Sequence, residues 1–510
     1  MLAWTIYISF LAALILLLLP KNNAAAARLL ALLAAIAGFT VALAAFLHHR
    51  TGELITVTRI PWIPSLGIEY HLAADGISLC LVLLTGIVAI AGILFSWNIQ
   101  HRTKEFFAFY LLLIGSVYGV FLSYDLFLLF VFYEIVIIPK YFLIAIWGST
   151  RKEYGAMKLA LYSFVGSAMV LVGLIAAYVA SGLHTMSLTG LAQAHFSQHF
   201  QLMAFPLVFI GFAILAGLWP FHTWAPTGHV AAPTAASMLL AGVVMKLGAY
   251  GCLRVAMTLF PLGLSPWGFH ILGLGSWRDV FAILAIIGII YGASVALVQK
   301  DFKFVIGYSS VSHMGFILLG LMTLNQIGLS GAIIQMVSHG ILAGLLFGVV
   351  GRMVYDRTHT RDLTALGPMN LNKAIPFAAV TFVLAGMASM GLPGFSGFVA
   401  EMMILIGAWH AFPLLATCVG LGILIGVIYI WRAMQKAFFA GDGLQPIHHV
   451  AGDHGTDEPL PPITFPERLG AIILIAASIT IGLYPQMLLK IITPALNSPL
   501  FQGLQQGVWK

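Results

Sequence analysis

The chain is short of charge. Only 8% of its 510 residues are Asp, Glu, Lys or Arg, while 61% are hydrophobic. A soluble domain carries about a quarter charged residues, so a surface built from this sequence must face lipid. The formal net charge of +7 would suggest nucleic acid as the partner of a soluble protein, but in a membrane protein an excess of Lys and Arg on cytoplasmic loops explains it better. We therefore expect an all-α polytopic membrane protein in contact with the bilayer, with no nucleic-acid partner.

Cysteine pairs and nucleotide-binding motifs are also missing. Cys80, Cys252 and Cys418 lie far apart in apolar runs and form no CxxC pair, which argues against an iron–sulfur or zinc centre. No GxGxxG opens a helix after a strand, and no GxxxxGK[ST] occurs, so we expect no bound nucleotide. The sequence predicts neither a cofactor nor a metal on this chain.

Long apolar runs are what the chain has in abundance. A membrane-spanning helix needs about 20 apolar residues, and we count fourteen such runs. They cover residues 2–19, 29–47, 76–95, 107–123, 126–147, 157–180, 203–224, 234–258, 279–298, 304–323, 328–350, 375–410, 412–437 and 468–486. The first run lacks the basic start of a secretory signal, so we expect a retained span rather than a signal peptide. The twelfth is too long for one simple helix and contains GLPGFSGF, which predicts two half-helices around a break.

The distribution of Lys and Arg predicts the orientation. The loops after odd-numbered spans hold sixteen of the 24 Lys and Arg residues. The opposite side holds six, namely Arg50, Arg59, Arg254, Arg278, Lys490 and Lys510. The remaining two, Lys140 and Lys246, lie inside spans. Because basic loops stay in the cytoplasm, both termini are expected on the other side.

The longest polar segments are 48–75 and 438–467. The second contains His448, His449 and His454 among Gly, Asp and Pro. A metal site is conceivable there, but a solvated loop fits the composition better. Neither segment is long enough for a separate soluble domain.

Proline breaks occur five helices apart, at Pro220 and Pro226 in the seventh span and at Pro393 in the twelfth. Two copies of a unit with an odd number of helices must have opposite orientations, which is the inverted-repeat arrangement of many transporters. We therefore expect three N-terminal helices in residues 1–106, a first five-helix repeat in 107–258 and an inverted second repeat in 279–437. A polar loop, the last helix and a tail fill 438–510.

Charged residues lie deep inside three of the predicted spans: Glu134 in the fifth, Lys246 in the eighth and Glu401 just after the break of the twelfth. Each costs about 2.5–3.5 kcal/mol to insert at the membrane centre. A structural ion pair is one explanation, although buried pairs rarely add net stability. Burial moves carboxyl and amine groups toward their neutral forms, so the pattern favours a proton relay.

Four histidines also lie in or beside the spans. His313 and His339 each follow a serine in adjacent spans, and His222 and His229 flank the break at Pro226. Neutral imidazole both donates and accepts, so these residues could extend a proton path. Buried histidines with purely structural hydrogen bonds remain the alternative.

Lys140 is harder to interpret. It follows Pro139 and lies six residues beyond Glu134, so on a regular helix the two would not share a face. A proline kink could bring them together. The amine could instead extend to the cytoplasmic end of the span.

Four strings then identify a family. HTWAPTGHVAAPTAASMLLAGVVMKLGAYG, DFKFVIGYSSVSHMGFILLG, QMVSHGILAGLLFGVVGRMVYDRTHTRDL and GLPGFSGFVAEMMILIGAW resemble the antiporter-like membrane subunits of respiratory complex I. Within that group the chain is most similar to the M-type subunit, because Glu401 stands where the L- and N-types usually have lysine. The resemblance covers most of the chain from the third span onward.

The resemblance implies a proton-translocating subunit of the membrane arm, without a redox centre, in a bacterial plasma membrane. Its partners would be L-type and N-type antiporter-like subunits. It also implies relay roles for Glu134, Lys246, Glu401, His313 and His339. The alternatives are a subunit of a multisubunit cation/proton antiporter, or of an energy-converting hydrogenase, or a scaffold that no longer pumps.

One departure from the family concerns the seventh span. Relatives carry a lysine five residues before the proline that matches Pro220, and this position is Leu215 here. The PDAH that usually follows is PTGH, so Thr227 replaces an acid. Glu134 therefore lacks its usual cation. We hypothesise that Lys140 substitutes for it from a different position in the backbone.

Overall fold

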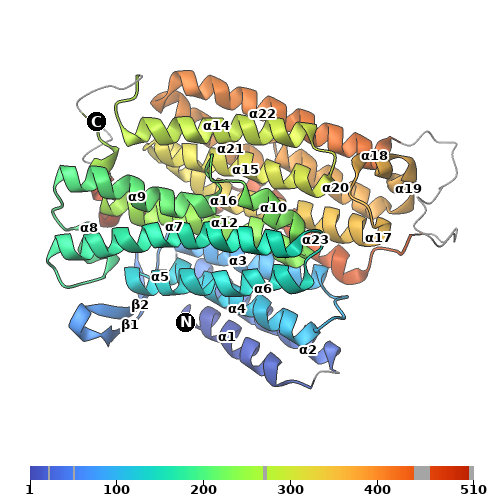
Figure 1. Ribbon diagram of the computed structural model, residues 1–510, viewed down its shortest axis with the longest axis horizontal. Coiled ribbons are helices and arrows are strands. Elements are labelled where there is room, and N and C mark those ends of the chain that lie inside the picture. Colours follow the sequence, from blue (N-terminus) through green and yellow to red (C-terminus); the bar gives the residue numbers. More distant parts are fainter. Residues whose placement is uncertain (21–22, 50–51, 268–272, 441–459, 505–510) are drawn as a thin grey trace.

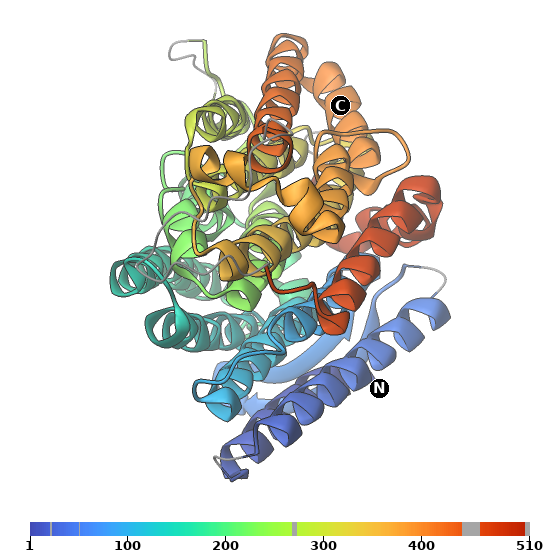
Figure 2. The same cartoon turned by 90° about the vertical axis from the view of Figure 1, so that its right-hand side faces the viewer.

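The computed structural model describes residues 1–20, 23–49, 52–267, 273–440 and 460–504. Its helices lie side by side along one direction, as Figure 1 shows from the side and Figure 2 from one end. Within the described residues, twelve helices are long and apolar enough to span a membrane. The shorter helix α1 (Ala3–Leu18) and a helix split into α20 (Pro376–Ser389) and α21 (Ser396–Ala411) match the other two predicted spans. The all-helical membrane fold is confirmed, and helices cover each of the fourteen predicted runs.

The twelve long spans have the following bounds. They are α2 (Ala24–His48), α3 (Gly76–Phe95), α4 (Thr103–Leu122), Leu126–Trp147 with α5 (Leu126–Ile135) and α6 (Ile137–Trp147), α7 (Lys152–Ser181), α9 (Gln198–Ala216), Thr234–Leu259, α14 (Trp277–Val298), α15 (Phe302–Met322), Gln326–Thr358, Pro413–Phe439 and α23 (Phe465–Leu483). Two short helices complete the parts used below, namely α10 (Trp224–Ala231) and α24 (Gln486–Leu496).

Several spans begin at a polar side chain that caps the helix. Asp75, Asp125, Ser276, Asp301 and Asn325 each accept a hydrogen bond from a backbone N–H of the first turn. Such caps satisfy donors that have no partner within the helix. These residues therefore fix where α3, α5, α14, α15 and α16 (Gln326–Phe347) start.

Two spans contain irregular helix that was not predicted from the sequence. The fifth span divides at Val136, three residues before Pro139, because proline has no N–H to donate to the preceding turn. The eighth span is continuous but irregular, with π-helical segments η2 (Leu240–Val244) and η3 (Cys252–Ala256) on either side of α12 (Met245–Gly251). Segments of this kind often occur at functional sites.

The predicted limits of the seventh span were wrong. Helix α9 ends at Ala216, and Gly217 has the left-handed conformation that commonly terminates helices. Pro220 lies in the turn that follows, but Pro226 lies in the first turn of α10, where the ring does not disturb a helix. The break is therefore at Pro220 and not at Pro226. In the twelfth span, the break predicted from GLPGFSGF is confirmed between α20 and α21.

The segment 48–75 is not an irregular polar loop. It contains strands β1 (Ile55–Ile63) and β2 (Ile68–Ala74), which pair in an antiparallel hairpin. The carboxylate of Asp125 accepts one hydrogen bond from the backbone of Glu69 in β2 and one from Leu128 in α5, both at 3.0 Å. The pKa of Asp125 is raised by burial. This contact ties the hairpin to the helix bundle.

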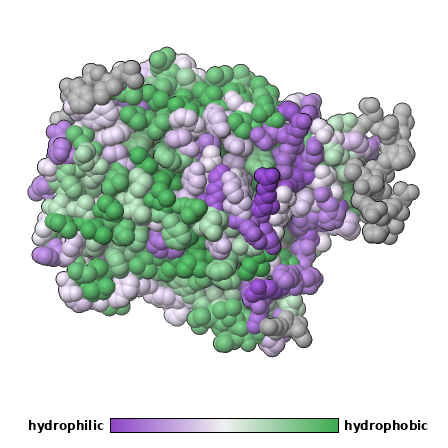
Figure 3. All heavy atoms as spheres, viewed as in Figure 1, coloured by the Kyte–Doolittle hydropathy of each residue, from purple (hydrophilic) through white to green (hydrophobic). Residues whose placement is uncertain are grey.

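Hydrophobic side chains cover the middle of the face shown in Figure 3, and hydrophilic side chains gather mainly toward the right-hand end. That end carries α17 (Asp356–Thr358) and α18 (Leu363–Leu366). It also holds Arg352 and Arg357, which both pair with the buried Glu467 at 2.5 and 2.8 Å. We refer to it below as the basic end, because it collects the loops after odd-numbered spans. An apolar surface of this kind suits contact with a bilayer.

Candidate functional site

The site begins at Lys246, at the start of α12 directly after a π-helical segment. Its side chain is fully buried. The amine donates a hydrogen bond to the carbonyl of Ala241, and Nζ lies 2.8 Å from Nδ1 of His339. No carboxylate of the described residues lies within 4.0 Å of this amine. Lys246 is therefore a buried amine whose side-chain partner is a histidine rather than an acid.

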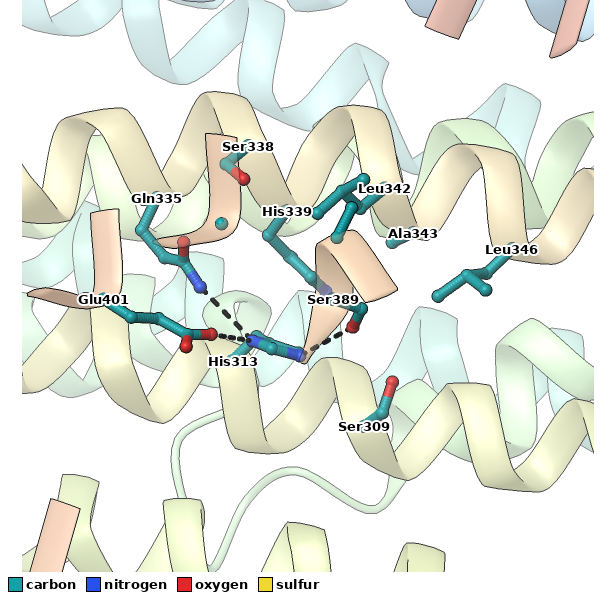
Figure 4. Close-up of a pocket in the computed structure, with 12 residues that line it drawn as sticks. Ser309, His313, Gln335, Ser338, His339, Leu342, Ala343, Leu346, Ser389 and Glu401 are labelled. Atoms are coloured by element: carbon teal, nitrogen blue, oxygen red, sulfur yellow. Dashed lines mark hydrogen bonds and ion pairs between the residues drawn. The ribbon is translucent and has the colours of Figure 1, made fainter. Parts of the chain in front are cut away.

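Two histidines continue the polar path across α16 and α15. The rings of His339 and His313 stack with centroids 5.3 Å apart. Nδ1 of His313 lies 3.4 Å from Oε1 of Glu401 and 3.2 Å from Nε2 of Gln335, and its Nε2 lies 3.2 Å from Oγ of Ser389. Figure 4 shows His313 at the centre of these three contacts. Both nitrogens of His313 are therefore engaged, one of them with an acid.

The break in the twelfth span makes room for Glu401. Gly391, between α20 and α21, has φ +77°, and a Cβ built on it would lie 2.8 Å from Oε2 of Glu401. A side chain at this position would therefore meet the carboxylate. The backbone at the break and the carboxylate of Glu401 therefore lie side by side, and the space for the carboxylate depends on glycine at position 391.

A small cavity connects these groups. It is lined by His313, His339, Gln335, Ser389 and Glu401, together with Ser309, Ser338 and apolar residues. The centre of a water molecule has about 10 Å³ of free space in it, which is room for about one water. A single water would suffice to connect hydroxyl, imidazole and carboxyl groups that do not touch directly.

Glu134 and Lys140 form a second, looser pair. Lys140 is 1% exposed and donates a hydrogen bond to Oγ of Ser163 on α7 at 2.8 Å. Glu134 is half-buried, and its Oε1 is buried without a hydrogen-bond partner in the described structure. The two charges act on each other electrostatically without a direct ion pair. Lys140 therefore points into the protein, and the alternative in which it extends to the cytoplasmic edge is wrong.

His222 and His229 are both buried but belong to different elements. His222 lies in the turn after α9, with its ring 5.0 Å from that of Tyr291. His229 lies inside α10, and neither of its ring nitrogens has a hydrogen-bond partner in the described residues. Lys246 is one of two cations that act on it electrostatically. Only His229 is therefore linked to the Lys246 site.

Leu215 fills its place in α9 as a core residue, 2% exposed. α9 packs tightly on the helix of Lys246, because a Cβ on Gly248 would lie 3.0 Å from the carbonyl carbon of Leu215. It packs equally closely on α7, where Gly211 faces Gly166. The seventh span thus lies between Ser163 and Lys246 without supplying a charge.

Sequence reasoning missed several polar residues of the site. Gln335 stands four residues before His339, on the same face of α16, and this spacing could have found it. Ser163 and Ser389 had no comparable signal. Arg254 was counted among the loop residues, but it is fully buried and pairs with Asp75 at 2.6 Å. Lys303 was also counted there and is likewise buried.

No cluster of three or more His, Cys, Asp or Glu residues that could hold a metal ion occurs among the described residues. His448, His449 and His454 lie outside them. The groups of the site are amines, imidazoles, carboxyls and hydroxyls, whose shared chemistry is proton exchange.

Comparison with known proteins agrees with this chemistry. Residues 123–426 match the family described as NADH:quinone oxidoreductase/Mrp antiporter, TM. The chain is 37% identical over 385 residues to NADH-quinone oxidoreductase subunit M of Rickettsia prowazekii, covering 74% of this chain and 75% of that protein. It is 34% identical over 496 residues to NAD(P)H-quinone oxidoreductase chain 4 1 of Synechococcus elongatus, covering 93% and 88%. Among solved structures, a chain of respiratory complex I from Thermus thermophilus with bound NADH superposes with a TM-score of 0.85 at 26% identity, covering 99% of both chains.

Proposed function

The chain belongs to the family of membrane subunits shared by NADH:quinone oxidoreductases and Mrp antiporters, and we propose that Lys246, His339, His313 and Glu401 carry protons through it. It is a multi-pass, proton-pumping subunit of the membrane arm of a multisubunit NADH:quinone oxidoreductase. The proposal concerns which of its residues perform the transfer.

The observation that carries the proposal is a line of neighbouring groups from an amine to an acid, in which water in the small cavity would connect the two stacked histidines. Nζ of Lys246 meets His339, His339 stacks on His313, and His313 meets Glu401. Imidazole can accept a proton at one nitrogen and release it from the other. Intramembrane charges are costly and usually mark ion pathways, and a line of four titratable groups is better explained by transfer than by packing.

The first half of the path is built differently from that of relatives. Glu134 and Lys140 would form its charge pair, and Lys140 would replace the seventh-span lysine of relatives. Ser163 would hold the Lys140 amine through its hydrogen bond. His229 would connect this half to Lys246, and His222 would be a peripheral member. In this arrangement residues 107–258 would supply the first repeat and 279–437 the second, with the breaks at Pro220 and Pro393 in corresponding helices.

The same proposal predicts the cofactor content, the partner subunits and the membrane of this chain. The chain would hold no cofactor of its own, because redox chemistry in other subunits would drive the charges of the path. Its neighbours would be L-type and N-type antiporter-like subunits, and its membrane the bacterial plasma membrane. The basic end would face the cytoplasm.

The experiment is to make Glu134→Gln and Lys246→Ala in the assembled complex and measure NADH:quinone turnover and the protons moved per electron pair. We expect both variants to lower coupled turnover, with Lys246→Ala the more severe. Lys104→Met is the matched control, because this lysine also donates to backbone carbonyls, those of Leu17 and Leu19, but lies off the path. Unchanged turnover and proton yield in both variants would refute the proposal.

A further inference from the structure

A polar cavity opens at the basic end of the bundle. It has a volume of about 450 Å³ and lies between the end of α3, the end of α6 and the starts of α11 (Thr234–Leu239) and α15. Hydrogen-bonding side chains make up much of its lining: Ser96, Asn98, Gln100, His101, Ser149, Thr234, Lys303, Tyr355 and Asp356. A cavity of this size and polarity in an otherwise apolar protein would fill with water.

Lys303 lies at the floor of this cavity. Its side chain is 2% exposed, and its amine donates a hydrogen bond to the carbonyl of Ala232 at 2.9 Å. The nearest acid in sequence, Asp301, pairs with Arg361 at 3.1 Å and caps α15 with its other oxygen. Within the described residues no carboxylate lies within 4.0 Å of the Lys303 amine. A lysine with a purely structural role would be expected to have an acid partner when buried.

The charges of both Lys303 and Lys246 act on the buried imidazole of His229. Its helix, α10, packs on α15, because a Cβ on Gly307 would lie 3.1 Å from Cα of Pro226. Ala232, which accepts the hydrogen bond from Lys303, immediately follows the same helix. His229 is fully buried, both of its ring nitrogens lack partners in the described structure, and Lys246 and Lys303 are the two cations that act on it.

We propose that this cavity is the entrance of the proton path from the basic end, and that Lys303 is the first residue of the path to bind the proton. The inference rests on the proposed function of the Lys246 relay. A hydrated proton in the cavity protonates the neutral Lys303 amine. The ammonium passes one proton through intervening water to a free nitrogen of His229. The imidazolium releases a proton from its other nitrogen toward Lys246, which leaves Lys303 and His229 neutral for the next cycle.

The test compares Lys303→Met with Lys303→Arg in the assembled complex. Arginine keeps the positive charge and can donate to Ala232, but it does not release its proton in proteins. A structural lysine would therefore be rescued by arginine, whereas a proton carrier would not. We expect both variants to lower coupled turnover roughly tenfold or more. The matched control is Lys300→Met, three residues away and exposed, which should behave as wild type.

Wild-type turnover in Lys303→Met, or full rescue by Lys303→Arg, would overturn the proposal. Because arginine retains the charge, that variant also serves if Lys303→Met fails to assemble. Lys246→Ala, measured in parallel, separates the two claims. If Lys246→Ala blocks proton transfer and Lys303→Met does not, the entrance is wrong but the relay stands. If neither variant has an effect, the relay fails as well.

Chemical rescue is a second test, and it distinguishes a proton-carrying amine from a lysine that only fills space. In Lys303→Ala, methylamine added to the aqueous phase can enter the cavity and replace the missing amine. We expect turnover to rise with the methylamine concentration in this variant and to stay constant in wild type and in Lys246→Ala. No rise in Lys303→Ala would count against a titrating amine at this site.

Discussion

Nζ of Lys246 lies 2.8 Å from Nδ1 of His339, with the lysine fully buried. Two nitrogens at this distance need one proton between them and one lone pair to accept it. If the lysine is an ammonium, Nδ1 must be unprotonated, and if Nδ1 carries a proton, the amine must be neutral. The pair therefore shares one bridging proton. A strictly structural contact would have no need of two titratable partners.

The first prediction follows from this contact. His339→Gln keeps an oxygen that can accept from the Lys246 amine but removes the ability to bind and release a proton. We expect the complex to assemble and coupled turnover to fall roughly tenfold or more. His410→Gln, on an exposed position of α21, is the control for the substitution. Turnover in His339→Gln equal to this control would show that His339 only positions the lysine.

The second prediction concerns the glycine beside Glu401. Gly391→Ala places a methyl group 2.8 Å from Oε2 of Glu401 and should displace the carboxylate from His313. Gly394→Ala is the matched control, because Gly394 also has positive φ, +96°, but no atom lies within 4 Å of the added methyl. Both substitutions strain the backbone by about 1–2 kcal/mol. A larger loss of proton translocation in Gly391→Ala than in Gly394→Ala, measured as protons per electron pair, is the expected result, and equal losses would contradict it.

The third prediction tests whether Lys140 replaces the charge missing from the seventh span. Lys140→Met should lower coupled turnover, because it removes the amine that interacts electrostatically with Glu134. Adding Leu215→Lys should restore part of it, since α9 lies between α7, which holds Ser163, and the helix of Lys246. Leu215→Met in the same background controls for the change in packing. If Lys140→Met pumps as wild type, Lys140 is not the substitute.

The fourth prediction concerns stability rather than transfer. Arg254 and Asp75 form a buried pair at 2.6 Å, with the guanidinium also over the rings of Tyr124 and Tyr250 at 5.3 Å. Arg254→Met leaves the carboxylate unpaired and should cost about 3–5 kcal/mol. Asp75→Asn combined with Arg254→Met should recover much of this loss, because no unpaired charge remains. Thermal unfolding of the purified complex measures both, and equal destabilisation of the single and double variants would argue against the charge as the cause.

The residues that sequence reasoning could identify are those whose chemistry conflicts with their surroundings. Lys246, Glu134 and Glu401 stand out because a charge in an apolar run is costly wherever the chain folds. The same argument gave the fourteen spans, since length and hydropathy decide which segments can cross a bilayer. It fails at the ends of helices, where it predicts a break at Pro226 although this residue lies in the first turn of α10. It also fails for residues 48–75, whose hairpin depends on pairing between two short strands.

Which of these groups meet depends on the tertiary structure. Lys246 and His339 are 93 residues apart, and His313 and Glu401 are 88 apart, so no local pattern could show that they touch. Arg254 and Lys303 looked like loop residues because each lies near the end of an apolar run, yet packing buries both. Because insertion energy depends on residue type and depth, the sequence alone predicts that charges lie within the membrane. The packing of α12, α15, α16 and α21 brings Lys246, His339, His313 and Glu401 into a line, and only such close approach allows a proton to pass.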